Sequence, residues 1–127
     1  MTRFDRFHIT DLKNCLYYSN IHDAIIEGFE YDRAGKRLTI EAVNPIHDVG
    51  IDFVFVDVKV LLSISGSELG SCETVLSLTV EEDYSCLKNC MQVCDDSVGD
   101  SLYLLFQMFN GDEIHIVSSE VLVEIKR

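Results

Sequence analysis

Basic residues are scarce in this chain. Its 127 residues include 10 Lys and Arg against 22 Asp and Glu, so the formal net charge at pH 7 is −12. Nucleic acids and anionic membrane surfaces are bound by clustered Lys and Arg side chains, which this composition does not favour. The same charge favours a basic partner, because opposite charges steer two proteins toward each other.

Long apolar runs and proline are scarce as well. No stretch approaches the length of apolar residues that spans a bilayer. The first ten residues, MTRFDRFHIT, lack the continuous apolar segment of a signal peptide. Pro45 is the one proline, and no low-complexity linker is present. We expect one domain over residues 1–127, in the cytoplasm, with its five cysteines reduced.

The segment from Asp52 to Ile64 (DFVFVDVKVLLSI) has the clearest structural pattern. From Val54 to Ile64 its even positions are all apolar and mostly β-branched, which predicts a long β-strand with this face in the core. The odd positions include Phe53, Phe55 and Leu61, so the second face is too apolar for a simple solvent surface. We expect a helix, a second sheet layer or another chain to cover it.

Similar patterns predict six further strands and one helix. The helix is expected over 10–18, with Thr10 as its N-cap and Leu12 and Leu16 on one side. Turns are expected at Gly35, with a positive φ, and at Asn110-Gly111, as a type I′ turn. The seven strands are expected at 24–31, 37–43, 52–64, 73–80, 101–109, 113–117 and 121–125.

The connections between these strands are mostly too short for parallel crossovers, so the pairing is expected to be antiparallel. Alternating strands must also cover their apolar faces. The predicted fold is therefore mainly β, with about seven antiparallel strands in a two-layer sandwich or a rolled sheet and a short N-terminal helix.

Two groups of residues have the chemistry of metal ligands. Cys86, Cys90 and Cys94 are four apart, whereas structural zinc sites usually contain C-x2-C pairs, so we interpret them as core thiols. The pairs His22-Asp23 and His47-Asp48 combine imidazole with carboxylate, which suits divalent metals. Such loop residues more often bond to nearby backbone groups, so this four-residue metal site is the less favoured alternative.

Motifs of common catalytic and nucleotide sites are missing from the sequence. It has no G-x-S-x-G nucleophile elbow, no P-loop and no G-x-G-x-x-G. His22-Asp23 has the letters of the HD-family phosphohydrolases, but those enzymes are helical and this pair leads into an expected strand. We therefore expect neither enzymatic activity nor a cofactor.

A family resemblance begins at His22, where His22-Asp23-Ala24-Ile25-Ile26 opens the first expected strand. It continues through Phe29-Glu30-Tyr31-Asp32 and Leu38-Thr39-Ile40-Glu41, and it ends with the acidic turn and alternating strands of the segment from Phe106 to Val123. These features resemble small bacterial β-rich proteins of the YxiG-like and immunity-protein-50 type. Residues 86–94 and the extension before Asn20 depart from the pattern. For the immunity-protein members, the resemblance implies neutralisation of a partner toxin.

The favoured hypothesis is a non-enzymatic, cytoplasmic binding protein, specifically an immunity protein for a basic toxin. The alternatives are the metal site described above and a homo-oligomer, in the simplest case a homodimer, that pairs through Phe53, Phe55 and Leu61. The acidic residues nearest the irregular segment are the expected contacts with a basic partner: Glu81, Glu82, Asp83, Asp95, Asp96 and Asp100.

Overall fold

The computed structural model describes residues 1–64, 74–83 and 101–127. In this part the chain is mainly β, with one short α-helix near the N-terminus, as predicted. The elements in order are β1 (Thr2–Asp5), the 3-10 helix η1 (Arg6–His8), α1 (Ile9–Tyr17), β2 (Ile25–Asp32), β3 (Arg37–Asn44), β4 (Val49–Ile64), β5 (Val75–Glu81), β6 (Leu102–Met108) and β7 (Glu113–Lys126).

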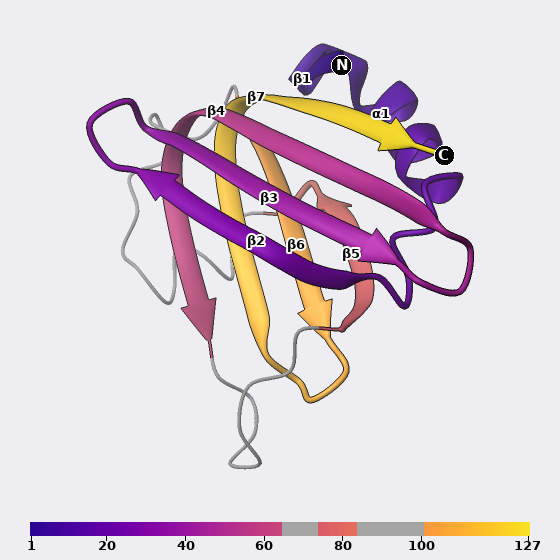
Figure 1. The fold of residues 1–127 in the computed structure, drawn as a ribbon. Coiled ribbons are helices and arrows are strands. Elements are labelled where there is room, and N and C mark those ends of the chain that lie inside the picture. Colours follow the sequence, from indigo (N-terminus) through magenta and orange to yellow (C-terminus); the bar gives the residue numbers. More distant parts are fainter. Residues whose placement is uncertain (65–73, 84–100) are drawn as a thin grey trace.

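All seven strands belong to one antiparallel sheet that is rolled but not closed (Figure 1). The strand order is β2-β3-β4-β7-β6-β5, and β1 pairs with the C-terminal half of β7. β4 has 16 residues and β7 has 14, so both run through two regions of the sheet. The first half-sheet contains β2, β3, β1 and the adjoining halves of β4 and β7. The second half-sheet contains their other halves with β6 and β5.

A bend in β4 and β7 separates the two half-sheets (Figure 1). Asp57 has a φ of 56°, and the register of β4 with β7 shifts between Val58 and Val60. Ser119 of β7 donates a hydrogen bond from Oγ to Asp57 Oδ2 at 2.6 Å, so both strands are tied together at the bend. Because β-bulges increase local bending and twist, this irregularity brings the inner faces of the half-sheets together.

The main core lies between the two inner faces. Phe53 and Phe55 on β4 are fully buried, and the Phe53 ring meets the Phe106 ring edge-on at 5.7 Å. The prediction that the even positions of this strand form the main core is therefore wrong apart from Val58. Val60 and Leu62 belong to a second, smaller cluster, whereas Leu61 packs against the main core. Both faces are apolar in sequence, and the core side changes across Asp57, since Val58 joins the core after Phe53 and Phe55. Phe53 and Phe55 are therefore not available at the surface to pair two subunits into a homodimer.

The C-terminal strand also differs from the prediction. Residues 113–117 and 121–125 were expected to form two strands around a corner, but β7 is continuous. The core side changes at this point: Ile116 precedes it and Val121 follows it in the same core. When the alternation of apolar and polar residues changes phase, the sequence suggests that the strand ends, although β7 continues through this point. β1 was not predicted, because four residues contain too little alternation to detect.

The residues predicted to face the core are correct for β6 and partly wrong for β5. On β6 the expected inward residues are in the core: Leu102, Leu104, Phe106 and Met108. On β5, Leu78 and Val80 face the core, but Leu76 is 42% exposed and Val75 is buried instead. A register shift between Val75 and Ser77 is the cause.

The predicted turns lie in the right places but with different backbone conformations. Between β2 and β3 the positive φ belongs to Lys36, at 52°, and not to Gly35. Between β6 and β7, Gly111 has a φ of 93°, whereas Asn110 does not have a positive φ, so the turn is not of type I′. The first turn also makes a tertiary contact, in which Val58 N donates a hydrogen bond to Lys36 O at 2.8 Å.

The helix α1 begins one residue before the prediction. Leu12 and Leu16, one turn apart, are buried, and the helix packs against β1 and β5. Thr10 is not the N-cap: η1 precedes the helix, and Asp5 Oδ1 accepts a hydrogen bond from Phe7 N at 2.9 Å. Within the described residues, no helix combines the length and hydrophobicity of a membrane span.

The bend predicts how substitutions at Asp57 affect stability. Asp57→Asn keeps an acceptor for Ser119 and tolerates a positive φ, whereas Asp57→Val places a β-branched side chain in the left-handed region. We expect Asp57→Val to be about 1–2 kcal/mol less stable than Asp57→Asn in urea unfolding. Ser63→Val is the control, because Ser63 is exposed and regularly paired on the same strand, and it should stay within about 0.5 kcal/mol of wild type. Equal stability of Asp57→Val and Ser63→Val would contradict the strain at the bend.

Candidate functional site

Three carboxylates lie directly opposite one another on the outer face of the first half-sheet. Glu41 of β3 pairs in register with Asp52 of β4, which pairs with Glu124 of β7. We call these three residues the acidic row. Its position follows from burial, since the residues next to it on each strand face the core: Ile40, Ala42, Ile51, Phe53 and Val123.

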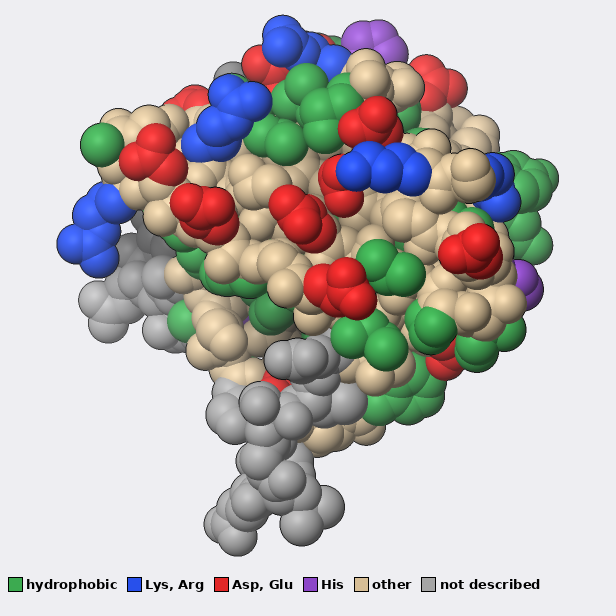
Figure 2. Space-filling model, in the orientation of Figure 1, with side chains coloured by type: hydrophobic (Ala, Val, Ile, Leu, Met, Phe, Trp, Pro, Cys, Tyr) green, Lys and Arg blue, Asp and Glu red, His purple; other side chains and the backbone are tan. Residues whose placement is uncertain are grey.

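The acidic row extends toward the edge strand β2. Gly28 pairs with Glu41, and a Cβ at Gly28 would lie 3.2 Å from Glu41 Oε2. The Glu41 side chain therefore occupies the space above Gly28. Glu30 of β2 is exposed and lies two residues further along this strand on the same face. Figure 2 shows acidic side chains across this face, with basic ones mostly toward its margins.

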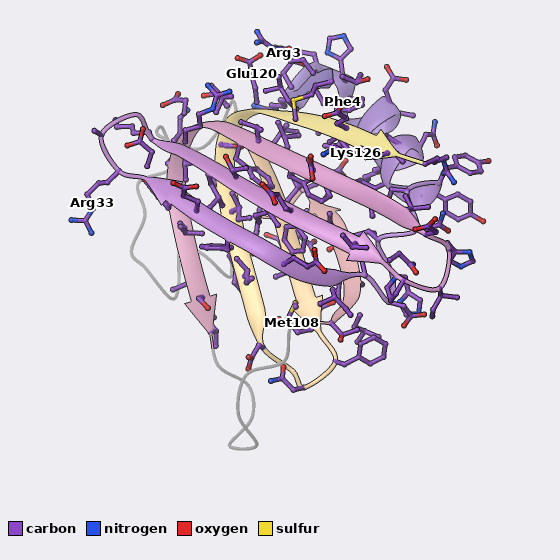
Figure 3. All side chains as sticks on the ribbon, viewed as in Figure 1. Arg3, Phe4, Arg33, Met108, Glu120 and Lys126 are labelled. Carbon is purple, nitrogen blue, oxygen red and sulfur yellow. The ribbon has the colours of Figure 1, made fainter. Side chains whose placement is uncertain are left out.

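One cation lies against the acidic row. Lys126 Nζ is 2.6 Å from Asp52 Oδ2, and Lys126, the last residue of β7, is labelled in Figure 3. The pKa of Lys126 is raised, first by this hydrogen bond and the charge of Asp52, and further by Glu124 and Glu41. At the upper margin of the face, Arg3 Nε is 3.3 Å from Glu120 Oε2. The three carboxylates of the row thus share one bound cation among the described residues.

No pattern in the sequence predicted the acidic row. Glu41 and Glu124 appear in the sequence as ordinary polar positions of alternating strands, and Asp52 marks only the start of the predicted long strand. Polar positions between Leu38, Ile40 and Ala42 indicate that Glu41 faces outward. That the three carboxylates meet depends on the register of three strands distant in sequence, which no local pattern specifies.

The open side of the roll lies along β2. In the part of the chain that the structure describes, β2 pairs with β3 on one side, and on the other side a single bridge joins Ile25 to Thr74. Phe29 is 46% exposed, while its β3 partner Ile40 is fully buried. A pocket of about 350 Å³ opens beside Phe29, and its lining includes Ile26, Met108, Ile114, Glu27 and Asp112.

The acidic residues predicted as partner contacts are only partly described. Glu81 ends β5 and accepts a hydrogen bond from Thr79 Oγ1 at 3.0 Å. Glu82 Oε1 lies 3.5 Å from Lys13 Nζ of α1, and Asp83 is exposed. All three described residues thus interact with other groups of the chain. Asp95, Asp96 and Asp100 lie outside the described residues, as do Cys86, Cys90 and Cys94.

The residues of the alternative metal site come close together but do not form a ligand set. His22, Asp23 and His47 line one pocket of about 370 Å³, whereas Asp48 does not contribute to its lining. His22 Nδ1 donates to Leu76 O at 2.5 Å, and His22 Nε2 is 3.6 Å from Asp23 Oδ2. Among the described residues, no group of three or more His, Cys, Asp or Glu has a geometry that could hold a metal ion.

The buried amide of Asn44 holds the loops that carry these histidines. Its Nδ2 donates to Asn20 O at 2.8 Å and to His22 O at 3.1 Å. Its Oδ1 accepts from Ile46 N at 2.9 Å and from His47 N at 3.2 Å. All four hydrogen-bonding positions of the amide are therefore used, which suits a side chain that is 1% exposed.

Comparison with known proteins does not identify a family. The chain matches no protein-family model, and no curated protein is similar to it at a significant level.

The contacts of Asn44 predict a large effect of its removal. Asn44→Ala would leave two carbonyls and two N–H groups without their partner, so we expect a loss of about 2–3 kcal/mol in the free energy of unfolding. Asn14→Ala is the matched control, because Asn14 is exposed on α1 and alanine favours helix. Chemical denaturation of both variants measures the difference, and similar stabilities would show that Asn44 does not hold these loops.

Proposed function

We propose that the protein is a non-enzymatic binding protein whose partner is a basic protein held on the outer face of the first half-sheet. The observation that carries this proposal is the acidic row. Like charges directly opposite one another on neighbouring strands destabilise a sheet, yet Glu41, Asp52 and Glu124 are aligned in this way. A cationic partner surface would relieve this repulsion.

The contacts of Lys126 support the same proposal. A single ammonium group lies close to Asp52, and the surrounding carboxylates raise its pKa. This arrangement illustrates how an incoming Lys or Arg side chain would be held. Beside the row, Val56 and Leu122 are half-buried on the same outer face, and they offer apolar contact area next to the charges. Apolar contact beside complementary charge is typical of protein interfaces.

In the cell, the proposed partner is a basic toxin and the proposed compartment is the cytoplasm. The resemblance of residues from His22 onward to immunity proteins motivates the toxin, and the net charge of −12 is consistent with rapid capture of a basic protein. Inhibition of this kind needs no catalytic group on the inhibitor. It requires that the bound protein covers or distorts a surface that the toxin uses.

The proposal predicts that residues of the acidic row reduce the stability of the free protein. We expect Glu41→Gln and Glu124→Gln each to raise the free energy of unfolding by about 0.2–1 kcal/mol at low ionic strength, because each removes like-charge repulsion. The gain should shrink at high salt, which screens exposed charges. Glu82→Gln is the control: it removes a surface ion pair with Lys13, so its stability should be unchanged or lower. A loss of stability in both row variants would contradict the repulsion.

The binding proposal predicts a partner with a specific dependence on the acidic row. We expect the immobilised wild-type protein to retain a basic protein from its native host at about 0.15 M salt. Asp11→Asn, which removes an exposed charge on α1, should retain it equally well. The double variant Glu41→Gln/Glu124→Gln should retain at least about tenfold less. Co-expression with the retained protein then tests the toxin hypothesis by cell survival. If retention does not depend on the acidic row, the proposed binding site is wrong. If co-expression gives no protection, the partner is not a toxin that this protein neutralises.

A further inference from the structure

We propose that the basic partner presents an extended segment that pairs as an additional strand with the free edge of β2. Basic side chains of this segment would lie on the outer face beside the acidic row, and alternating apolar side chains would enter the open side of the roll. This inference rests on the proposed function and specifies how the partner is recognised.

The backbone of β2 is available for such pairing. In the described part of the chain, β2 is the terminal strand of the sheet, and residues 28–32 pair with β3 without a register shift. On an edge strand, alternate residues direct N–H and C=O groups away from the neighbouring strand, which forms a template for another strand. Five residues correspond to about 17 Å of added strand.

The inner face next to this edge is only partly covered by the residues that the structure describes. None of the β2 residues is buried, although their β3 partners Leu38 and Ile40 are fully buried. Phe29 lines the pocket of about 350 Å³, and Tyr31, two residues later, lines another of about 560 Å³. Side chains two residues apart on a strand point to the same face, about 7 Å from each other. Phe29 and Tyr31 thus have the spacing of alternate side chains on an added strand. The rest of the second pocket is lined by Arg33, Lys59, Val60 and Leu61.

The outer face next to the same edge selects basic side chains. Gly28 has no side chain, so a Lys or Arg on the adjacent added strand can reach Glu41, which lies over Gly28. Glu30, two residues after Gly28 on β2, is exposed on the same face. A partner strand with alternating basic and apolar residues therefore complements both faces: cations toward Glu41 and Glu30, and apolar groups toward Phe29.

A second copy of this chain fits the edge less well. Its own β2 contains Glu27, Glu30 and Asp32, so self-pairing would place carboxylates against carboxylates. Each copy also has a net charge of −12. Charges and a bulge on an edge strand are known means of preventing self-association, and β2 has a register shift between Ile26 and Gly28. These features disfavour the pairing of an acidic strand with the edge of β2, whereas a basic strand can pair there.

An end-blocked, fluorescent octapeptide of alternating Lys and Val is the probe, and fluorescence anisotropy measures its affinity. We expect the octapeptide with four Lys followed by four Val to bind at least about tenfold more weakly, since it has the same charge without the alternation. N-methylation of alternate residues blocks one edge of the peptide backbone. One of the two N-methylated analogues should lose about tenfold or more, and the other should bind like the parent.

Matched protein variants test the inner face. Phe29→Ala should weaken binding by about fivefold or more, whereas Leu76→Ala should have no effect, because Leu76 is a similarly exposed residue (42% against 46%) on the opposite edge strand. No binding of the alternating peptide overturns strand addition. Equal binding of both N-methylated analogues also overturns it. If that binding is still lost in Glu41→Gln/Glu124→Gln, the acidic row keeps its proposed role. Retention of basic proteins that does not depend on the row would instead overturn the proposed function.

Discussion

The bend at Asp57 and Ser119 is the constraint on which the rest of the structure depends. β4 and β7 each pass through it, so a single sheet supplies both walls of the core. Without the change of phase at this point, Phe53, Phe55 and Val58 could not all reach the same interior. Within the described residues, the roll also leaves β2 and β5 as separate edges, joined by one bridge between Ile25 and Thr74. The open side beside Phe29 is thus a direct consequence of how the sheet bends.

The outer face of the first half-sheet has a different character from the core that it covers. The burial of their strand neighbours fixes which face its charged residues occupy, so Glu41, Asp52 and Glu124 leave the sheet at adjacent positions. Placing three carboxylates in register is unfavourable in isolation, and one lysine offsets part of the repulsion. Proteins commonly retain such unfavourable arrangements where a partner is bound. In our proposal, the same basic segment would complete the unpaired edge of β2 and place cations beside Glu41, at the end of the row nearest this edge.

Much of the secondary structure could be predicted because it depends on local patterns. Alternation located β3 and β6 within one or two residues, and the pair Leu12 and Leu16 located α1. The errors share a cause: Leu76, the even face of β4 and the supposed corner in β7 all involve a shift of phase at an irregularity. Of the candidate site, the sequence indicated the excess of acid but not its location. The predicted metal residues His22, Asp23 and His47 do converge on one pocket without forming a ligand set.

The sequence by itself determined the all-antiparallel β class, the short N-terminal helix and the strongly acidic character, because these follow from periodicity, loop length and composition. Tertiary structure decided which apolar face of β4 is the core, since Phe53 and the neighbouring valines are equally suited to burial until the bend assigns them sides. It also decided that Glu41, Asp52 and Glu124 stand together. Strand register joins residues far apart in the chain, and it is set by the packing of the whole sheet rather than by any local segment.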